Sequence, residues 1–330
     1  MAPTATDLSP ESLRLDAASA VEEIAAQLKE TVYRTLRRRG AVVGLSGGVD
    51  SSLVAFLCAR AFGPERVLGV LMPEGESAPD TLDLSRVSAE AAGVETVLED
   101  ITPILEAAGC YERRDAAIRT VLPEYGAGWK AKIVLPSLLG SDRYSLFSVV
   151  AESPDGERRE ARLTATAYRE VVAATNFKQR VRKMLEYHHA DRLDYAVVGT
   201  PNRLEYDQGF FVKNGDGSAD VKPIAHLYKT QVYQLADHLG VPAEIRERPP
   251  TTDTYALEQS QEEFYFSVPF DRLDLLLYAR NQGLSVDVAA AGTGLEPEIV
   301  ERVYADIDRK RRAAEYLHAP SLLVAPLDPS

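Results

Sequence analysis

Residues 41–52 combine glycine, serine and aspartate at a spacing that suits the binding of a phosphate group. They read Ala-Val-Val-Gly-Leu-Ser-Gly-Gly-Val-Asp-Ser-Ser. Gly47 and Gly48 form a predicted turn between a short apolar strand and a helix that opens at Ser51. Glycines let the backbone approach an oxyanion, and a helix N-terminus favours phosphate. Asp50 lies on the same turn and would repel a phosphate unless a cation such as Mg²⁺ lay between them.

The spacing of these glycines excludes two common nucleotide-binding loops. The P-loop requires Gly-Lys-Ser/Thr, and no lysine follows the glycines. The dinucleotide fingerprint Gly-x-Gly-x-x-Gly does not match the positions of Gly44, Gly47 and Gly48. Residues 46–51, Ser-Gly-Gly-Val-Asp-Ser, instead resemble the pyrophosphate-binding loop of the ATP pyrophosphatases. That resemblance implies a loop that holds the β- and γ-phosphates of ATP while the α-phosphate passes to a substrate carbonyl.

A second group of polar residues follows the apolar run Tyr-Ala-Val-Val-Gly later in the chain. Thr200 offers a hydroxyl at a predicted strand end, and Glu205 offers a second oxygen ligand for Mg²⁺. Asp216 lies in a Gly-Asp-Gly turn, from which a carboxylate is available to accept a proton. Lys213 and Lys229 carry positive charges suited to phosphates.

The elements that must position these residues alternate between strands and helices. Apolar runs and helical spacing predict, in order, a helix at 15–39, a strand at 41–43, a strand at 67–71, a helix at 81–92 and strands at 94–98 and 195–199. Such alternation implies parallel βαβ units in a doubly wound α/β sheet. Ligands bind these sheets at the carboxyl ends of strands, so we expect loops 44–51, 72–80 and 200–205 to converge on one crevice.

The segment at about 128–164 is an insertion that a minimal α/β fold does not require. Strand-like runs at 144–152 and 157–164 flank Ser-Pro-Asp-Gly and predict a β-hairpin, within an insertion spanning about 128–164. A long helix at 165–190 follows it, and the C-terminal third is predicted to be mostly helical, with its clearest helix at 296–316.

These elements predict the domain organisation. We expect a flexible tail at 1–14, a single domain at 15–318 and a C-terminal tail at 319–330. The sequence shows no internal repeat and no low-complexity stretch.

The composition bounds the class of protein. The chain has 330 residues, of which 45% are hydrophobic and 26% charged, as in ordinary globular proteins. Its net charge of −13 argues against a general nucleic-acid binder, because contacts to a phosphate backbone require a basic surface. Cys58 and Cys110 form no metal-binding pair, so we expect a reduced, cytoplasmic setting. Neither a signal peptide nor a membrane-spanning apolar run is expected.

Taken together, the motifs resemble those of the ammonia-dependent NAD synthetases, a family of ATP pyrophosphatases. The resemblance covers about residues 20–312 and is strongest between 176 and 251. The segments that follow the family's pattern in order are Asn176–Met184, Gly199–Glu205, Gly209–Lys213, Gly215–Gly217, Asp220, Pro223-Ile224, Leu227–Gln231, Pro250–Asp253, Gln261–Glu263 and Lys310-Arg311.

The resemblance implies a fold and a reaction. The implied fold is similar to the adenine nucleotide alpha hydrolases. In the implied reaction, the carboxylate of deamido-NAD attacks the α-phosphorus of ATP to give an acyl-adenylate and pyrophosphate, and ammonia then displaces AMP to give NAD. The resemblance also implies Mg²⁺ as cofactor and a homodimer with substrate bound across its interface. No glutaminase domain is recognisable, so free ammonia or a separate glutaminase partner is implied.

The same resemblance assigns roles to residues. The implied ATP-binding residues are Gly44, Leu45, Ser46, Gly47, Gly48, Val49, Asp50, Ser51, Thr200, Lys229 and Thr251. The implied contacts to the dinucleotide acid are Asn176, Arg180, Lys213, Asp220, Arg309 and Lys310. Asp50 and Glu205 are expected to hold Mg²⁺. Catalysis is expected to depend on Ser46, Asp50, Asp216 and Lys229.

Three features depart from the family's pattern. Arg309 stands where the family has histidine before the C-terminal lysine, and Gln261-Glu-Glu replaces Gln-x-Asp-Glu. The segment 110–164 is longer than expected, and roughly forty extra residues in a compact domain are usually functional. All three departures lie on the side of the acid substrate.

Two alternative functions therefore stay open on the sequence. One is a paralogous ammonia-dependent amide ligase that acts on a different carboxylic acid. The other is a non-catalytic nucleotide-binding protein. The joint presence of Asp50, Glu205 and Lys229 argues against the second alternative.

Overall fold

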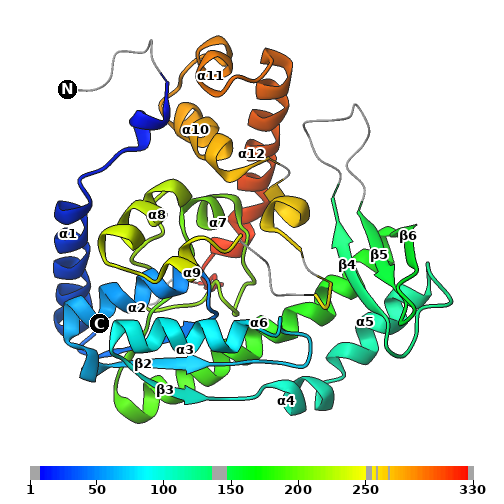
Figure 1. Cartoon of the computed structure of the whole chain (residues 1–330), viewed down its shortest axis with the longest axis horizontal. Helices are drawn as coiled ribbons and strands as arrows, with labels where there is room; N and C mark the ends of the chain where they lie inside the picture. Colours follow the sequence, from blue (N-terminus) through cyan, green and yellow to red (C-terminus); the bar gives the residue numbers. More distant parts are fainter. Residues whose placement is uncertain (1–7, 136–146, 250–254, 258, 267, 326–330) are drawn as a thin grey trace.

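The main sheet of the molecule has four parallel strands. The computed structural model describes residues 8–135, 147–249, 255–257, 259–266 and 268–325. The strands are β1 (Ala41–Leu45), β2 (Val67–Leu71), β3 (Glu95–Leu98) and β7 (Ala196–Val197). Their order is β3-β2-β1-β7. β2 and β3 are added on one side of β1 and β7 on the other, so the strand order reverses between β1 and β7 (β2 and β3 are labelled in Figure 1). The predicted parallel α/β sheet is confirmed, and ligands bind such sheets at the point of reversal.

Helices cover both faces of this sheet, because strand side chains alternate between two apolar cores. Val43 and Leu45 of β1 face one core, and Val42 faces the other. The first core is formed with α1 (Ala17–Glu30), α2 (Val49–Phe62), α3 (Thr81–Ala92) and α8 (Lys229–His238). The second is formed with α4 (Thr102–Ala107), α5 (Cys110–Arg119) and α6 (Ala165–Leu193). This arrangement is the doubly wound fold expected from the sequence.

Several element boundaries differ from the predicted ones. The first strand continues through Gly44 to Leu45, and α2 begins at Val49 rather than Ser51, with Gly48 as its N-cap. The predicted helix at 15–39 is α1 followed by one π-helical turn that ends at Thr35. The last predicted strand is shorter than expected. Among the described residues after β7, one further bridge forms, between Val198 and Val221.

A second, antiparallel sheet packs beside α5 and the first half of α6. It consists of β4 (Lys130–Val134), β5 (Ser148–Glu152) and β6 (Arg158–Arg162) in the order β4-β5-β6 (Figure 1). The predicted hairpin is the pair β5–β6, and residues 144–146 of its first predicted strand lie outside the described residues. β4 was not predicted. Its inward residues Ala131 and Ile133 share an apolar core with Val171 of α6.

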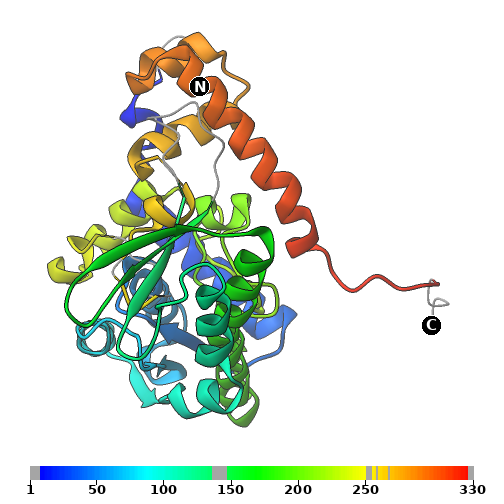
Figure 2. The same ribbon diagram turned by 90° about the vertical axis from the view of Figure 1, so that its right-hand side faces the viewer.

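The C-terminal third is helical, as expected, and has its own core. This core lies between α10 (Phe270–Asn281), α11 (Val286–Thr293) and α12 (Pro297–His318). Leu8 and Leu13 are buried in it, which corrects the prediction of a flexible tail for residues 8–14. After α12 the chain leaves regular structure and extends away from the body (Figure 2).

Short helices complete the described structure. They are α7 (Arg203–Gln208), α9 (Ala243–Arg246), the 3-10 turns Pro10–Leu13 and Pro64–Arg66, and the π-helical turn η4 (Glu262–Phe266). Among the described helices, none has the length and apolar character needed to cross a membrane.

Candidate active site

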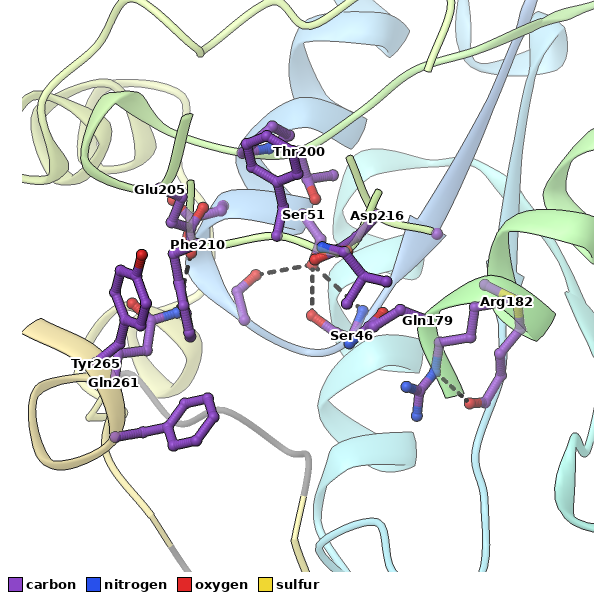
Figure 3. Close-up of a pocket in the computed structure, with 18 of the residues that line it drawn as sticks. Ser46, Ser51, Gln179, Arg182, Thr200, Glu205, Phe210, Asp216, Gln261 and Tyr265 are labelled. Carbon is purple, nitrogen blue, oxygen red and sulfur yellow. Dashed lines mark hydrogen bonds between the residues drawn. The ribbon is translucent and has the colours of Figure 1, made fainter. Parts of the chain in front are cut away.

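A cavity of about 730 Å³ opens at the carboxyl ends of the central strands (Figure 3). Its walls include residues of the β1–α2 loop, Met72 and Pro73 after β2, and Thr200 and Glu205 after β7. The three loops predicted to converge do line one cavity. Further parts of the wall come from α6, from residues 209–216, from η4 and from residues of α3, α8, α9 and α12.

The loop after β1 is held by a small network of hydroxyl groups. The Ser46 hydroxyl lies 3.2 Å from that of Ser51, and the Ser46 N–H donates to the Ser51 hydroxyl at 3.3 Å. The Ser51 hydroxyl is 3.1 Å from the Gly48 carbonyl oxygen, to which the hydroxyl of Ser52 also donates at 2.9 Å. The loop is therefore shaped before any ligand arrives, and the first N–H groups of α2 lack helical partners and remain available to a phosphate.

Two glycines of this loop are required by their surroundings. Gly47 has a φ of 71°, and a β-carbon there would lie 2.9 Å from the Thr81 carbonyl oxygen. A β-carbon at Gly44 would lie 2.8 Å from a carboxylate oxygen of Glu186 on α6. Gly44 lines the cavity, whereas Gly47 turns the chain against α3.

Asp50 meets two partners that come from distant parts of the chain. The buried ammonium group of Lys229 forms an ion pair with one carboxylate oxygen of Asp50. The side-chain amide of Asn202 donates to the other oxygen at 3.0 Å. Burial lowers the pKa of Lys229, but the carboxylates of Asp50 and Glu205 outweigh it and raise that pKa above its ordinary value. Lys229 thus stays charged in the cavity.

Glu205 is joined to Asp50 through Asn202. The Asn202 N–H donates to Glu205 Oε2 at 3.1 Å, and the Glu205 N–H donates to Asn202 Oδ1 at 3.2 Å, which forms a capping box at the start of α7. The side-chain amide of Gln261 donates to Glu205 Oε1 at 3.0 Å (Figure 3). Loss of hydration and the nearby Asp50 carboxylate raise the pKa of Glu205 to about 8.

Asp274 of α10 positions Lys229, although nothing in the sequence pointed to it. It is fully buried, and its two carboxylate oxygens accept from the N–H groups of Lys229 at 3.2 Å and Thr230 at 2.7 Å. These are the first two residues of α8, so the carboxylate caps the helix from which Lys229 extends. Burial raises the pKa of Asp274 to about 6.

One face of α6 forms the wall opposite α7. The predicted residues Asn176 and Arg180 line the cavity there, together with Gln179 and Arg182, which had no predicted role. The guanidinium of Arg180 donates to the Lys213 carbonyl oxygen at 3.3 Å, and that of Arg182 donates to the Met72 carbonyl oxygen at 3.3 Å.

Lys213 and Asp216 both line the cavity and both hold backbone groups. The ammonium group of Lys213 donates to the carbonyl oxygens of Tyr316 at 2.6 Å and Ala319 at 2.8 Å, at the end of α12. Asp216 accepts from the Val212 N–H at 2.7 Å, which closes the turn between them. Loss of hydration raises the pKa of Asp216.

Three of the predicted substrate residues lie outside the cavity of the single chain. Asp220 accepts from the N–H of Val197 at 2.8 Å and from the hydroxyl of Tyr187 at 3.2 Å. Arg309 is exposed and pairs with Asp306. Lys310 is buried, and burial lowers its pKa. Its ammonium group donates to the Tyr265 carbonyl oxygen at 2.6 Å and lies 2.8 Å from Asp306. Thr251, predicted to contact ATP, lies outside the described residues.

Aromatic side chains form an apolar part of the cavity wall that was not predicted. They include Tyr168, Phe210, Phe211, Tyr255, Phe264 and Tyr265. The rings of Phe210 and Tyr265 are stacked with their centroids 4.8 Å apart. The adjacent pair Phe210-Phe211 in a glycine-rich segment was a usable signal in the sequence, whereas the other rings are scattered over about a hundred residues.

Comparison with known proteins identifies the family. The model of the family described as NAD synthase matches residues 20–121 and 153–314, and β4 lies in the unmatched stretch between them. The chain is 58% identical over 311 residues to the NH(3)-dependent NAD(+) synthetase of Mesorhizobium japonicum, covering 94% of this chain and 98% of that relative. It is 56% identical to the enzyme of the same name from Rhizobium rhizogenes, covering 97% of this chain and 96% of the relative.

Among solved structures, the fold is similar to that of the NH3-dependent NAD synthetase from Campylobacter jejuni. The TM-score is 0.61 at 22% sequence identity, and the match covers 94% of this chain and 100% of that one. The family model and the close relatives each span most of the sequence. The chain therefore belongs to the NAD synthase family.

Proposed function

We propose that this protein is an ammonia-dependent NAD synthetase. It adenylates the carboxylate of deamido-NAD with ATP and transfers ammonia to the activated carbonyl, which yields NAD, AMP and pyrophosphate. The observation that carries the proposal is the meeting of the β1–α2 phosphate loop with Asp50, Lys229 and Glu205 in one cavity. Relatives that share more than half of the sequence carry the same name.

The first step joins the acid to AMP. A carboxylate oxygen of the substrate forms a bond to the α-phosphorus of ATP, and the bond between that phosphorus and the bridging oxygen breaks, which releases pyrophosphate. We assign the binding of the leaving phosphates to the N–H groups of the loop and to the hydroxyls of Ser46 and Ser51. Lys229 adds a positive charge where negative charge develops. No side-chain nucleophile is needed, so positioning carries the catalysis.

The second step forms the amide. Neutral ammonia forms a bond to the acyl carbon, the bond from that carbon to the AMP oxygen breaks, and one proton leaves the nitrogen. We assign Asp216 as the acceptor of this proton, because its carboxylate lines the cavity and loss of hydration raises its pKa toward that of a working base.

Asp50 and Glu205 are the residues that we assign to Mg²⁺. Mg²⁺ is commonly held by one or two carboxylates together with substrate phosphates. The donor set fits, because the two carboxylates are close enough for Asp50 to raise the pKa of Glu205, a repulsion that a cation relieves. When bound, the ion supplies positive charge to the leaving pyrophosphate.

For the dinucleotide acid we propose a site shared between two chains. Asn176, Arg180 and Lys213 face the cavity of their own chain. Asp220, Arg309 and Lys310 do not line that cavity. Asp220 and Arg309 are exposed, so we assign them to the acid held by a second copy, whereas the buried Lys310 acts through Asp306 and the Tyr265 carbonyl oxygen. This distribution supports a homodimer in which the acid lies across the interface.

The nitrogen source is proposed to be free ammonia or a separate glutaminase. Cys58 and Cys110 are buried and free, and burial raises the pKa of both thiols. Such thiols are poor nucleophiles and do not suit glutamine hydrolysis. Free thiols also favour a reducing compartment, which supports our placement of the reaction in the cytoplasm.

A direct assay tests the function. The purified protein is incubated with Mg-ATP, an ammonium salt and deamido-NAD, and NAD, AMP and pyrophosphate are measured by mass spectrometry. We expect all three products in equal amounts. A panel of other carboxylic acids serves as control, and pyrophosphate release with one of them but not with deamido-NAD would contradict the assigned substrate.

A further inference from the structure

A buried cluster of charged side chains lies behind the cavity, and the proposed mechanism does not use it. We name it the clamp cluster, and its members are Glu74, Glu76, Tyr111, Arg114 and Lys178. The ammonium group of Lys178, on α6, lies 2.8 Å from a carboxylate oxygen of Glu74 and 2.8 Å from one of Glu76. The side chains of Lys178 and Glu74 are 1% and 0% exposed, so the ion pair is shielded from water.

Helix α5 holds the same two glutamates from the other side. The hydroxyl of Tyr111 donates to Glu74 Oε2 at 2.5 Å, and the guanidinium of Arg114 donates to Glu76 Oε2 at 2.5 Å. Glu74 also accepts from the Glu76 N–H at 3.2 Å. Both glutamates belong to the loop that follows β2, so this loop is fastened to two helices at once.

The cost of burying these charges points to a geometric role. Apolar residues of similar volume commonly stabilise a fold as well as a buried ion pair does, or better. Charged hydrogen bonds instead fix the length and direction of each contact. Burial alone would raise the pKa of Glu76, but Lys178 and Arg114 outweigh it and hold that pKa below its usual range. The glutamate stays ionised, and the contacts stay strong.

The clamp cluster joins the loop after β2 to α6, and both of these elements also form walls of the cavity. Met72 and Pro73 begin the loop, and Asn176 and Gln179 flank Lys178 on α6. One helical turn after Lys178, Arg182 donates to the Met72 carbonyl oxygen. One face of α6 therefore lines the cavity, while Lys178 on the neighbouring face holds the loop whose first residues, Met72 and Pro73, also line it.

We propose that Lys178 is a positioning residue for nucleotide binding, because it fixes the spacing between the loop after β2 and the cavity face of α6. The inference rests on the proposed function only in taking ATP as a ligand of this cavity. Helix α6 is anchored in two apolar cores by several residues, whereas the loop enters one of them only through its first residue, Met72. Loss of Lys178 should therefore move the loop, and with it the wall of the nucleotide site.

The test compares nucleotide binding in wild type and in Lys178→Met. Calorimetry with Mg-ATP alone should show a dissociation constant about ten- to a hundredfold higher in the variant, the range expected for a small displacement of binding groups. In the amide assay, the KM for ATP should rise by a similar factor, while kcat and the KM for deamido-NAD change less. Lys178→Arg, which keeps the charge, should recover part of the loss.

A second variant guards against simple unfolding. Lys178→Met leaves two buried carboxylates with fewer partners, so the double variant Lys178→Met/Glu74→Gln removes one of these charges as well. Its nucleotide affinity should still be reduced although its thermal stability is closer to wild type. Wild-type affinity in a folded double variant would overturn the proposal.

A matched control comes from the same helix. The imidazole of His189 is buried and lies 2.8 Å from Glu99, a residue that follows β3 and does not line the cavity. His189→Leu removes a buried polar contact between α6 and a strand end without touching the loop after β2. It should lower stability and leave ATP affinity unchanged, and an equal loss of affinity in both variants would show that Lys178 acts only through stability. Calorimetry tests the role of Lys178 even if the wild-type protein makes no NAD. A failure to make NAD would count against the proposed function but not against the role of Lys178 in nucleotide binding.

Discussion

Asp274 accepts a hydrogen bond from the N–H of Lys229 across 3.2 Å, and the side chain of the same lysine forms an ion pair with Asp50. The carboxylate of Asp274 on α10 thus fixes the first turn of α8. Lys229, on that turn, places its ammonium group beside Asp50 of the phosphate loop. A carboxylate at a helix N-terminus is favoured by the partial positive charge of the helix end. Helix α10 therefore contributes to the geometry of the nucleotide site although none of its residues lines the cavity.

The first prediction concerns Asp274→Asn and the pH dependence of stability. The folded-state pKa of about 6 lies above the ordinary value of 3.8, so the folded protein binds this proton more tightly than the unfolded chain does. The stability that Asp274 contributes is complete below its unfolded pKa and is lost as the pH rises through about 6. The asparagine variant lacks this loss.

Urea denaturation of both proteins measures the effect. Between about pH 5 and about pH 8, the free energy of unfolding of wild type should fall by about 1 kcal/mol more than that of Asp274→Asn. A difference that is the same at both pH values would mean that Asp274 is not held with a raised pKa.

The second prediction is that Asp50→Asn abolishes AMP formation while the fold stays intact. Asparagine keeps the size of the side chain but removes the charge that pairs with Lys229. We expect turnover to fall at least about a hundredfold, as is common when a group that acts on developing charge is lost. Circular dichroism should match wild type. Undiminished turnover would rule out the metal-binding and catalytic roles assigned to Asp50.

The third prediction separates the two substrates. Lys229→Ala deletes a cation beside the phosphate loop, so it should raise the KM for ATP or lower kcat. Arg180→Ala removes a guanidinium from the α6 wall, so it should mainly raise the KM for deamido-NAD. Initial-rate kinetics with each substrate varied in turn measures both effects. An effect confined to the opposite substrate in either variant would show that the two sites are exchanged.

Much of the fold follows from local patterns in the sequence, and the exceptions have physical reasons. The apolar run at 41–43 predicts most of β1, which in the structure continues through Gly44 to Leu45. β4 was missed because it spans only five residues and its partner β5 begins more than ten residues later. The burial of Leu8 and Leu13 was missed because their partners lie in α10 and α11, which no local pattern reveals.

The site was predictable where chemistry is concentrated in one loop and not where it depends on distant contacts. Asp50, Lys229 and Glu205 belong to recognisable segments and do meet. Asp274 lies between two leucines in a helix, 45 residues from the N–H group that it caps, so it resembles an ordinary helical position. Lys178 lies within the recognisable segment Asn176–Met184. Its partners Glu74 and Glu76 lie about a hundred residues earlier in the chain, so no local pattern reveals the contact.

The last prediction concerns Arg309, which stands where the resemblance implies a histidine. In the single chain its side chain is 60% exposed, pairs with Asp306 and does not line the cavity. A direct contact to the acid therefore requires that Arg309 reach the cavity of a second copy. We expect Arg309→Ala to raise the KM for deamido-NAD and to leave the KM for ATP unchanged, since arginine supplies a cation for a phosphate of the acid.

Mixed dimers distinguish a contact across the interface from one within a chain. Arg309→Ala and Asp50→Asn chains are co-expressed with different tags, and the mixed species is purified. If each active site is shared between the chains, one of the two active sites of the mixed dimer combines an intact Asp50 with an intact Arg309 from the other chain. Its activity at low deamido-NAD should then exceed that of the Arg309→Ala dimer and that of the Asp50→Asn dimer. If Arg309 acts within its own chain, each site of the mixed dimer carries one defect, and no activity is regained. A mixture that stays monomeric on gel filtration would instead remove the shared site from the proposal, because a residue that lies outside its own cavity then has no second cavity to reach.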